Sequence, residues 1–292
     1  GSPFLVPFMQ FSRKQGDQIT VRRVELGPLR GPESERLAAS LLGDHPKAQH
    51  WATAIAKEAQ GNPFFIETLS RGVMQGDLDR SEDAPSLHAA LSARVLRLEP
   101  EARHILDVVC VAQRPLLRQH TLDIAALGAK GPRGLSVLRA ENLVRVRSSG
   151  AHETVEPYHE RIRQTVVDIL TSEKVHELNR DIANTLEGAE NVRPENLVDH
   201  LVDAGDLPRA QRHAVESAAQ AAEKLAFDRA AQLYTRALEL QGPSMSNDED
   251  SARQTLQMAR ADALLNAGHG TKAAHAFEEL AKNGPMSLRL DF

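Results

Sequence analysis

The chain has 292 residues, of which 41% are hydrophobic, 26% charged and only 4% aromatic. This length allows two or three domains, and frequent Ala and Leu with few aromatic residues favour helices over a sheet-rich fold. The formal net charge of −5 excludes a general basic attraction to nucleic acid. The single cysteine, Cys110, lies in an apolar run and cannot form an internal disulfide, which is typical of a reducing cytoplasm.

Targeting signals are not visible in the sequence. No stretch approaches the roughly 18–20 apolar residues that a membrane span needs, and no signal peptide is recognisable. We therefore expect a cytoplasmic protein without a membrane partner. The chain opens with Gly1-Ser2 rather than Met, from which we expect it to be a piece of a longer protein.

Residues 2–29 carry a short apolar run and then a strand-like run, TVRRVEL, at residues 20–26. The run ends at Gly27-Pro28, a strong breaker of regular structure. A single short strand must pair with others, so we expect its sheet to lie upstream of this chain.

Residues 30–99 read as a helical domain. Helices are expected from residue 32, over 48–60, from 64 and from 87, with a polar loop over 76–85. Leu37, Leu41 and Leu42 form the expected apolar stripe of the first helix. Gly61-Asn62-Pro63 is expected to end the second helix, because Gly and Asn tolerate the left-handed conformation and Pro forbids continuation.

Residues 100–172 show a different order of elements. A helix starts at Pro100 and ends before Pro115, and shorter helices are expected over 120–127 and 135–141. Two strand-like runs at 143–147 and 154–156 flank the turn sequence SSG, and a helix over 159–170 follows. Three helices followed by a hairpin is the order of a winged helix.

Residues 173–292 are expected to be entirely helical. The expected helices are 174–187, 194–204, 207–224, 227–240, 251–267 and 271–282, with an acidic linker at 247–250. Paired antiparallel helices at intervals of roughly 34–45 residues indicate a TPR-like α-solenoid. The predicted fold class is therefore mainly α, with a helical bundle and a winged-helix unit followed by a TPR-like α-solenoid.

Four phrases in this sequence together resemble one family. They are VELGPL at 24–29, GNPFFIE at 61–67, LHAAL at 87–91 running on to LEPEAR at 98–103, and YHERIRQTV at 158–166. In this order, and followed by a TPR-like array, they resemble the STAND branch of AAA-like ATPases, which are large bacterial signalling regulators. The resemblance covers nearly the whole chain. It implies that 1–29 is a remnant of the nucleotide-binding domain, followed by domains at 30–99, 100–172 and 173–292.

The resemblance implies a regulatory and interaction segment that couples nucleotide state to partner sensing. Members of this family are often joined to a protein kinase, cyclase or transcription-regulator domain. No G-x-x-x-x-G-K-[ST] motif is present, so the chain is not expected to be an enzyme. ATP or ADP with Mg²⁺ would be bound by the longer parent, through an N-terminal P-loop domain that this chain lacks. The alternative is a free-standing TPR-like adaptor that binds a protein segment and has no nucleotide role.

Two residues are candidates for contact with nucleotide in that parent. The resemblance implies that Pro63 packs near the adenine, although a structural turn alone also explains it. It further implies that His159 reaches the β-phosphate of ADP and holds a closed state, and an imidazole can donate a hydrogen bond to phosphate. The structural alternative for His159 is a helix cap.

Other sites are not expected. Five arginines make the winged helix locally basic: Arg139, Arg145, Arg147, Arg161 and Arg163. The expected recognition helix at 135–141 nevertheless has few polar side chains that could contact base edges. We therefore expect no nucleic-acid partner. The other histidines lack metal-ligand spacing, and Cys110 is expected to be buried and inert. Alanines at 218–222 and 230–237 favour close helix packing, and the concave face they build is expected to bind a peptide or a neighbouring domain.

Overall fold

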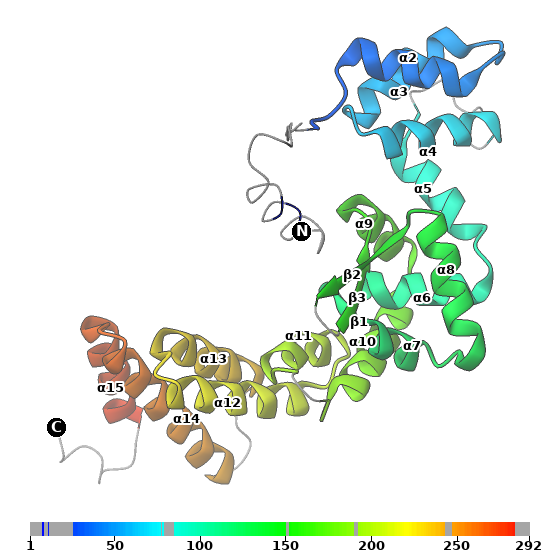
Figure 1. Ribbon diagram of the computed structural model, residues 1–292. Coiled ribbons are helices and arrows are strands. Elements are labelled where there is room, and N and C mark those ends of the chain that lie inside the picture. Colours follow the sequence, from blue (N-terminus) through cyan, green and yellow to red (C-terminus); the bar gives the residue numbers. More distant parts are fainter. Residues whose placement is uncertain are drawn as a thin grey trace. The chain divides into compact units, whose positions relative to one another are not determined.

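The computed structural model describes residues 26–76, 78, 85–149, 152–189, 192–242 and 247–283, together with Phe8 and Phe11. The chain forms two compact units, Gly1–Ala90 and Leu91–Phe292, and helices dominate both (Figure 1). The predicted mainly helical fold class is confirmed. None of the helices in the described part of the chain is long and apolar enough to cross a membrane. The four predicted domain boundaries stay predictions.

The first unit is a small helical bundle. It contains α2 (Gly31–Leu42), α3 (Ala48–Ala59), α4 (Pro63–Met74) and the start of α5 (Leu87–Leu96). Helix α2 packs against both α3 and α4, and α3 packs against α4. The side chains that fill the space between them are Ala38, Leu42, Trp51, Ile55, Ile66, Leu69 and Val73.

The buried face of α2 differs from the predicted stripe. Ser34, Ala38 and Leu42 are buried, whereas Leu41 is 41% exposed. Residues four apart lie on one face of a helix, and the two neighbouring helices cover the face that contains Ala38. Leu41 lies one position away from Leu42 and therefore about 100° around the helix.

The turn between α3 and α4 is held by a close backbone contact. Gln60 and Gly61 both have positive φ, and the backbone N–H of Leu29 donates to the Gly61 carbonyl at 2.8 Å. A Cβ on Gly61 would lie 2.3 Å from the Leu29 oxygen, so only glycine fits. Asn62, predicted to share the left-handed conformation, is instead the N-cap of α4 and accepts from Phe64 N at 3.0 Å.

Two predicted features of this unit fall largely outside the described residues. The strand expected at 20–26 is described only at Leu26, and Leu26–Arg30 has no regular secondary structure. The polar loop expected at 76–85 is described only at its ends and at Leu78.

The second unit begins with helices around a small sheet. Its elements are α6 (Pro100–Val111), β1 (Leu116–Leu117), α7 (Arg118–Ala125), η2 (Gly128–Lys130), α8 (Gly131–Ala140), β2 (Val144–Ser149), β3 (His152–Pro157) and α9 (Glu160–Ile169). The sheet is antiparallel with the order β1-β3-β2, and Val155 pairs with both Leu116 and Val146. Three helices followed by a hairpin were predicted here, and that order of elements is confirmed.

Helix α8 begins earlier than the sequence suggested. It starts at Gly131 rather than at Leu135, and two of its glycines lie close to side chains of α6 and α7. A Cβ on Gly134 would lie 2.9 Å from Ile105 Cδ1, and one on Gly131 would lie 2.9 Å from Leu122 Cδ2. The glycine content of residues 128–134 lowers helix propensity, which hid this first turn.

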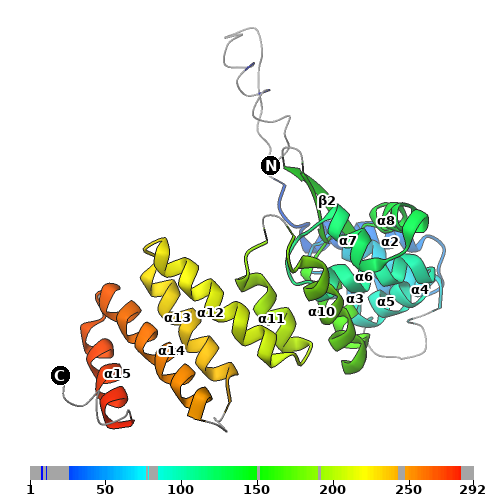
Figure 2. The same cartoon turned by 90° about the horizontal axis from the view of Figure 1, so that it is seen from below.

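The rest of the unit is a row of helices. They are α10 (Ser172–Leu186), α11 (Glu195–Asp203), α12 (Leu207–Glu223), α13 (Phe227–Leu240), α14 (Asn247–Asn266) and α15 (Gly270–Asn283). Each helix packs against the next, and Figures 1 and 2 both show α12 to α15 lying side by side. Helix α10 also packs against α6 and α7. This arrangement confirms the predicted TPR-like helical array, since each helix contacts mainly its neighbours.

Small alanine side chains allow these helices to pack closely against one another. Ala210, Ala214, Ala218, Ala230, Ala237 and Ala261 are all fully buried. Ala219, from the predicted stripe, is exposed. The predicted linker at 247–250 is instead the first turn of α14, because Asn, Asp and Glu are residue types that helix starts favour as well as linkers.

Candidate functional site

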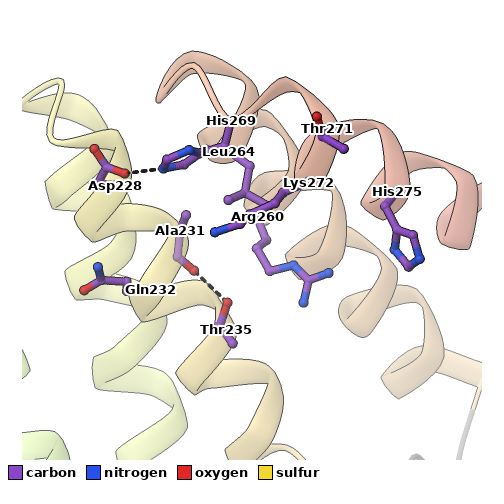
Figure 3. Close-up of a pocket in the computed structure, with 10 residues that line it drawn as sticks. All are labelled: Asp228, Ala231, Gln232, Thr235, Arg260, Leu264, His269, Thr271, Lys272 and His275. Carbon is purple, nitrogen blue, oxygen red and sulfur yellow. Dashed lines mark hydrogen bonds and ion pairs between the residues drawn. The ribbon is translucent and has the colours of Figure 1, made fainter.

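A groove of about 570 Å³ runs over the last three helices of the array. Its floor is α14, and its walls are α13 and α15 with the turn between α14 and α15 (Figure 3). The lining residues are Asp228, Ala231, Gln232, Thr235, Arg260, Leu264, His269, Thr271, Lys272 and His275. Small buried side chains lie between these helices, among them Ala230, Ala261, Ala263 and Ala276.

Cations outnumber anions along the groove. Arg260 and Lys272 carry permanent positive charge, and Asp228 is the one acidic residue among the described lining residues. Asp228 is already engaged, because its Oδ1 lies 2.7 Å from His269 Nε2. This pair lies at one end of the groove, and His275 lies further along α15 (Figure 3).

The guanidinium of Arg260, in the floor of the groove, does not use all of its hydrogen-bond donors in the described part of the chain. Its Nε is buried and has no hydrogen-bond partner among the described residues. The nearest carboxylate is that of Glu279, 3.9 Å from Nη2, which is too long for a good hydrogen bond. A buried donor without a partner is costly, and an anionic group in the groove would stabilise the Arg260 guanidinium through its charge.

Pro63, the first residue of α4, is exposed. Its missing N–H suits the first helical position, where no intrahelical partner exists. Phe65 and Ile66 after it are buried, while Phe64 is half-buried. The structure therefore gives the turn a packing role, and the adenine contact stays a prediction.

His159 is the N-cap of α9. Its Nδ1 accepts a hydrogen bond from the backbone N–H of Arg161 at 3.1 Å. Because that N–H can only donate, Nδ1 carries no proton, and the neutral ring has its proton on Nε2. Burial, followed by the neighbouring Arg161, lowers the pKa of His159 and favours this neutral form. Pro63 and His159 belong to different units.

Three of the five arginines in the region predicted to be a winged helix are paired. Arg145 and Arg147 both contact Glu156, and Arg163 contacts Glu160. These pairs lower the local positive field that the sequence suggested. The absence of a nucleic-acid partner remains an expectation.

Cys110 and the histidines show no reactive cluster. Cys110 is fully buried, and burial raises the pKa of its thiol well above the ordinary range. Within the described ranges, no group of three or more His, Cys, Asp or Glu side chains could hold a metal ion.

No protein-family model matches the chain, and no curated protein matches it in sequence. One solved structure similar to it is that of a Signal Transduction ATPase with Numerous Domains (STAND) protein with a tetratricopeptide repeat sensor, from Pyrococcus horikoshii. The identity is 16%, the TM-score is 0.43, and the match covers 92% of this chain and 44% of that protein. The chain thus spans less than half of the length of that protein, and a similarity at this level does not establish a shared activity.

The groove is the feature that sequence reasoning did not find. A concave peptide-binding face was predicted from alanines, but the lining cations were not. Arg260 and Lys272 come from different helices, and only the packing of α14 against α15 brings them together. Their spacing in the sequence carries no signal for this.

Proposed function

We propose that this chain is the regulatory and interaction segment of a multidomain STAND-type signalling ATPase, and that its helical repeats bind a protein partner. The four sequence phrases and their order support the family assignment. The order of α6, α7, α8 and the β2-β3 hairpin, with β1 between the first two helices, supports a winged helix in the region 100–172. No hydrolytic role is proposed for this chain.

The observation that carries partner binding is the groove over α13, α14 and α15. It has a concave form, two permanent cations and a buried donor without a partner among the described residues. An acidic protein segment fits this chemistry, because its carboxylates would meet Arg260 and Lys272 while its apolar atoms lie on Ala231 and Leu264. An extended segment fits better than a small metabolite, because the lining residues extend along α13, α14 and α15.

The test uses a fluorescein-labelled octaglutamate peptide and fluorescence anisotropy. Wild-type chain should bind it more tightly than octaglutamine, and binding should weaken as salt rises. Lys272→Glu should reduce the affinity at least about tenfold, because a like charge now faces the peptide. The matched control is Lys224→Glu, an exposed lysine at the end of α12 that does not line the groove.

The two variants separate groove binding from a general charge effect. Equal losses of peptide affinity in Lys272→Glu and Lys224→Glu would show that binding depends only on the net charge of the chain. No loss in either variant would remove the groove from the proposal.

The nucleotide part of the proposal concerns the longer parent. There, ATP or ADP with Mg²⁺ would be held by a P-loop domain, with Pro63 near the adenine and His159 donating to phosphate. The cap bond of His159 supports this role, because it leaves Nε2 as the protonated nitrogen of the neutral ring. The winged helix would then report nucleotide state to the repeats.

A further inference from the structure

A second cavity, separate from the groove, lies where the small sheet meets the first helices of the array. It measures about 500 Å³, within the range of small-molecule sites. Strand β1, helix α7 and strand β3 form one side, and α10 and α11 form the other. The cavity goes beyond the proposed partner groove, because it shares no lining residue with it.

The cavity has an apolar body. Leu116 and Leu186 are buried, and Leu117 and Val192 are partly buried. Ala112 and Pro115 also line the cavity, so apolar residues are the majority of the described lining residues. An apolar ligand surface placed here would leave water, which is the main source of affinity in such sites.

One permanent charge lines the cavity. Arg114 is the cation, and none of the described lining residues is Asp or Glu. Its Nη1 donates to Asn196 Oδ1, a contact between residues 82 positions apart in the sequence. Because a guanidinium has five N–H donors, this contact fixes the side chain and leaves further donors for an anion.

His200 adds a neutral polar group to the wall. Its Nδ1 lies 2.8 Å from Asn179 Oδ1, and Asn179 Nδ2 donates to the Val175 carbonyl. The amide oxygen therefore accepts, so Nδ1 of His200 carries the proton and Nε2 is an acceptor. Burial also lowers the pKa of His200, which keeps the ring neutral. In this tautomer Nε2 accepts hydrogen bonds and offers no donor to an anion.

We infer that this cavity binds a small amphipathic organic monoanion, a carboxylate with an apolar tail, with Arg114 holding the carboxylate. The tail lies on Leu116, Leu117 and Leu186. Because the two walls come from the sheet region and from the helical array, an occupant contacts both. The chain would thus sense a small carboxylic acid in addition to a protein segment.

The probe is octanoate, titrated into the chain with labelled Leu and Val methyl groups and followed by NMR. We expect saturable shifts of the Leu116, Leu117, Leu186 and Val192 methyls. Octanol, which has the same tail without the charge, should bind at least about tenfold more weakly, as expected for loss of a charge-assisted hydrogen bond.

Arg114→Gln should weaken octanoate binding by a similar factor and leave the melting temperature near wild type, because Arg114 is exposed. Arg36→Gln is the matched control, since Arg36 is exposed on α2 and does not line the cavity. The inference is overturned if these methyls show no saturable shift up to the highest soluble concentration. It is also overturned if octanol binds as tightly as octanoate, or if Arg114→Gln binds as tightly as wild type.

Discussion

Leu225 has a left-handed backbone conformation, and glycine occupies the equivalent position in two other turns of the helical array. The turns before α12, α13 and α15 each contain one residue with positive φ, namely Gly205 at 78°, Leu225 at 59° and Gly268 at 80°. The same pair of backbone hydrogen bonds closes all three turns. Leu225 is 73% exposed, so its side chain contributes little packing to offset this strain.

Leu225→Gly should therefore stabilise the chain. We expect the free energy of unfolding to rise by about 0.5–1 kcal/mol, since glycine reaches the left-handed region without a Cβ clash. Urea unfolding followed by circular dichroism measures this. Leu225→Ala is the control, because it removes the side chain but keeps the Cβ. Equal stabilities for the Gly and Ala variants would show that backbone strain is not the cause.

His200 makes stability depend on pH. Its pKa is lowered from the ordinary value of 6.5, mainly by burial and also by Arg114, with Asp199 opposing. The native state thus binds fewer protons than the unfolded state near and below pH 6.5. The stability that the neutral ring contributes is present above the unfolded pKa and is lost as pH falls below it.

His200→Gln tests this sign, because glutamine can still hydrogen-bond to Asn179 but does not titrate. The variant should be less stable than wild type at pH 7.5, and the difference should shrink at pH 5.5. Urea unfolding at each pH measures the difference in free energy of unfolding between the variant and wild type. His176→Gln, at an exposed position on α10, is the control and should leave stability near that of wild type. A constant difference between wild type and His200→Gln would contradict the assignment.

Elements with a regular apolar spacing could be predicted closely from the sequence. Helix α13 has the predicted bounds Phe227–Leu240, and α3, α10 and α12 begin or end within two residues of their predictions. Their apolar residues recur every three or four positions, so the helical period is unambiguous. Caps such as Asp206, which accepts from Arg209 N, reinforce these starts.

The missed elements lack such a local signal. Strand β1 has two residues, and it exists because Leu116 and Leu117 pair with the edge of β3. No sequence window of two residues can predict that pairing. The same reasoning applies to the groove and to the small cavity. Both depend on which helices become neighbours, and the sequence does not reveal this. Pro63 and His159 were predicted from a family resemblance and not from residue spacing.

Helices α12, α13 and α14 depend on one small core for their stacking. Leu233 and Tyr234 pack there with Ala218, Ala230 and Ala263. Leu233→Asp should destabilise the repeats by several kcal/mol, because an unpaired carboxylate would be buried between helices. Thermal unfolding followed by circular dichroism should show an early transition for the variant.

The neighbouring position provides the control for Leu233→Asp. Gln232 is exposed on the same helix, so Gln232→Asp changes helix propensity and charge without touching the core. Its melting temperature should stay close to wild type. An unchanged melting temperature for Leu233→Asp itself would show that the assigned face of α13 is wrong.

For the whole molecule, the central question is whether His159 links the proposed winged helix to nucleotide in the longer parent that we propose. The cap and the phosphate contact use different ring nitrogens, so they can be separated by mutation. Asparagine caps helices as well as other good capping residues do, but it lacks the imidazole Nε2 donor. His159→Asn should therefore keep the stability of α9, whereas His159→Ala should lose about 1 kcal/mol.

In the full-length protein, both substitutions should release ADP faster and raise basal output. A hydrogen bond to a charged phosphate is worth about 1.5–3 kcal/mol, so its loss should shift a closed-to-open equilibrium about tenfold or more. Stopped-flow release of a fluorescent ADP analogue measures the rate, with His176→Ala on α10 as the control that should leave it unchanged. If His159→Asn releases ADP at the wild-type rate and only His159→Ala is faster, then His159 acts through the helix cap alone, and the proposed phosphate contact is wrong.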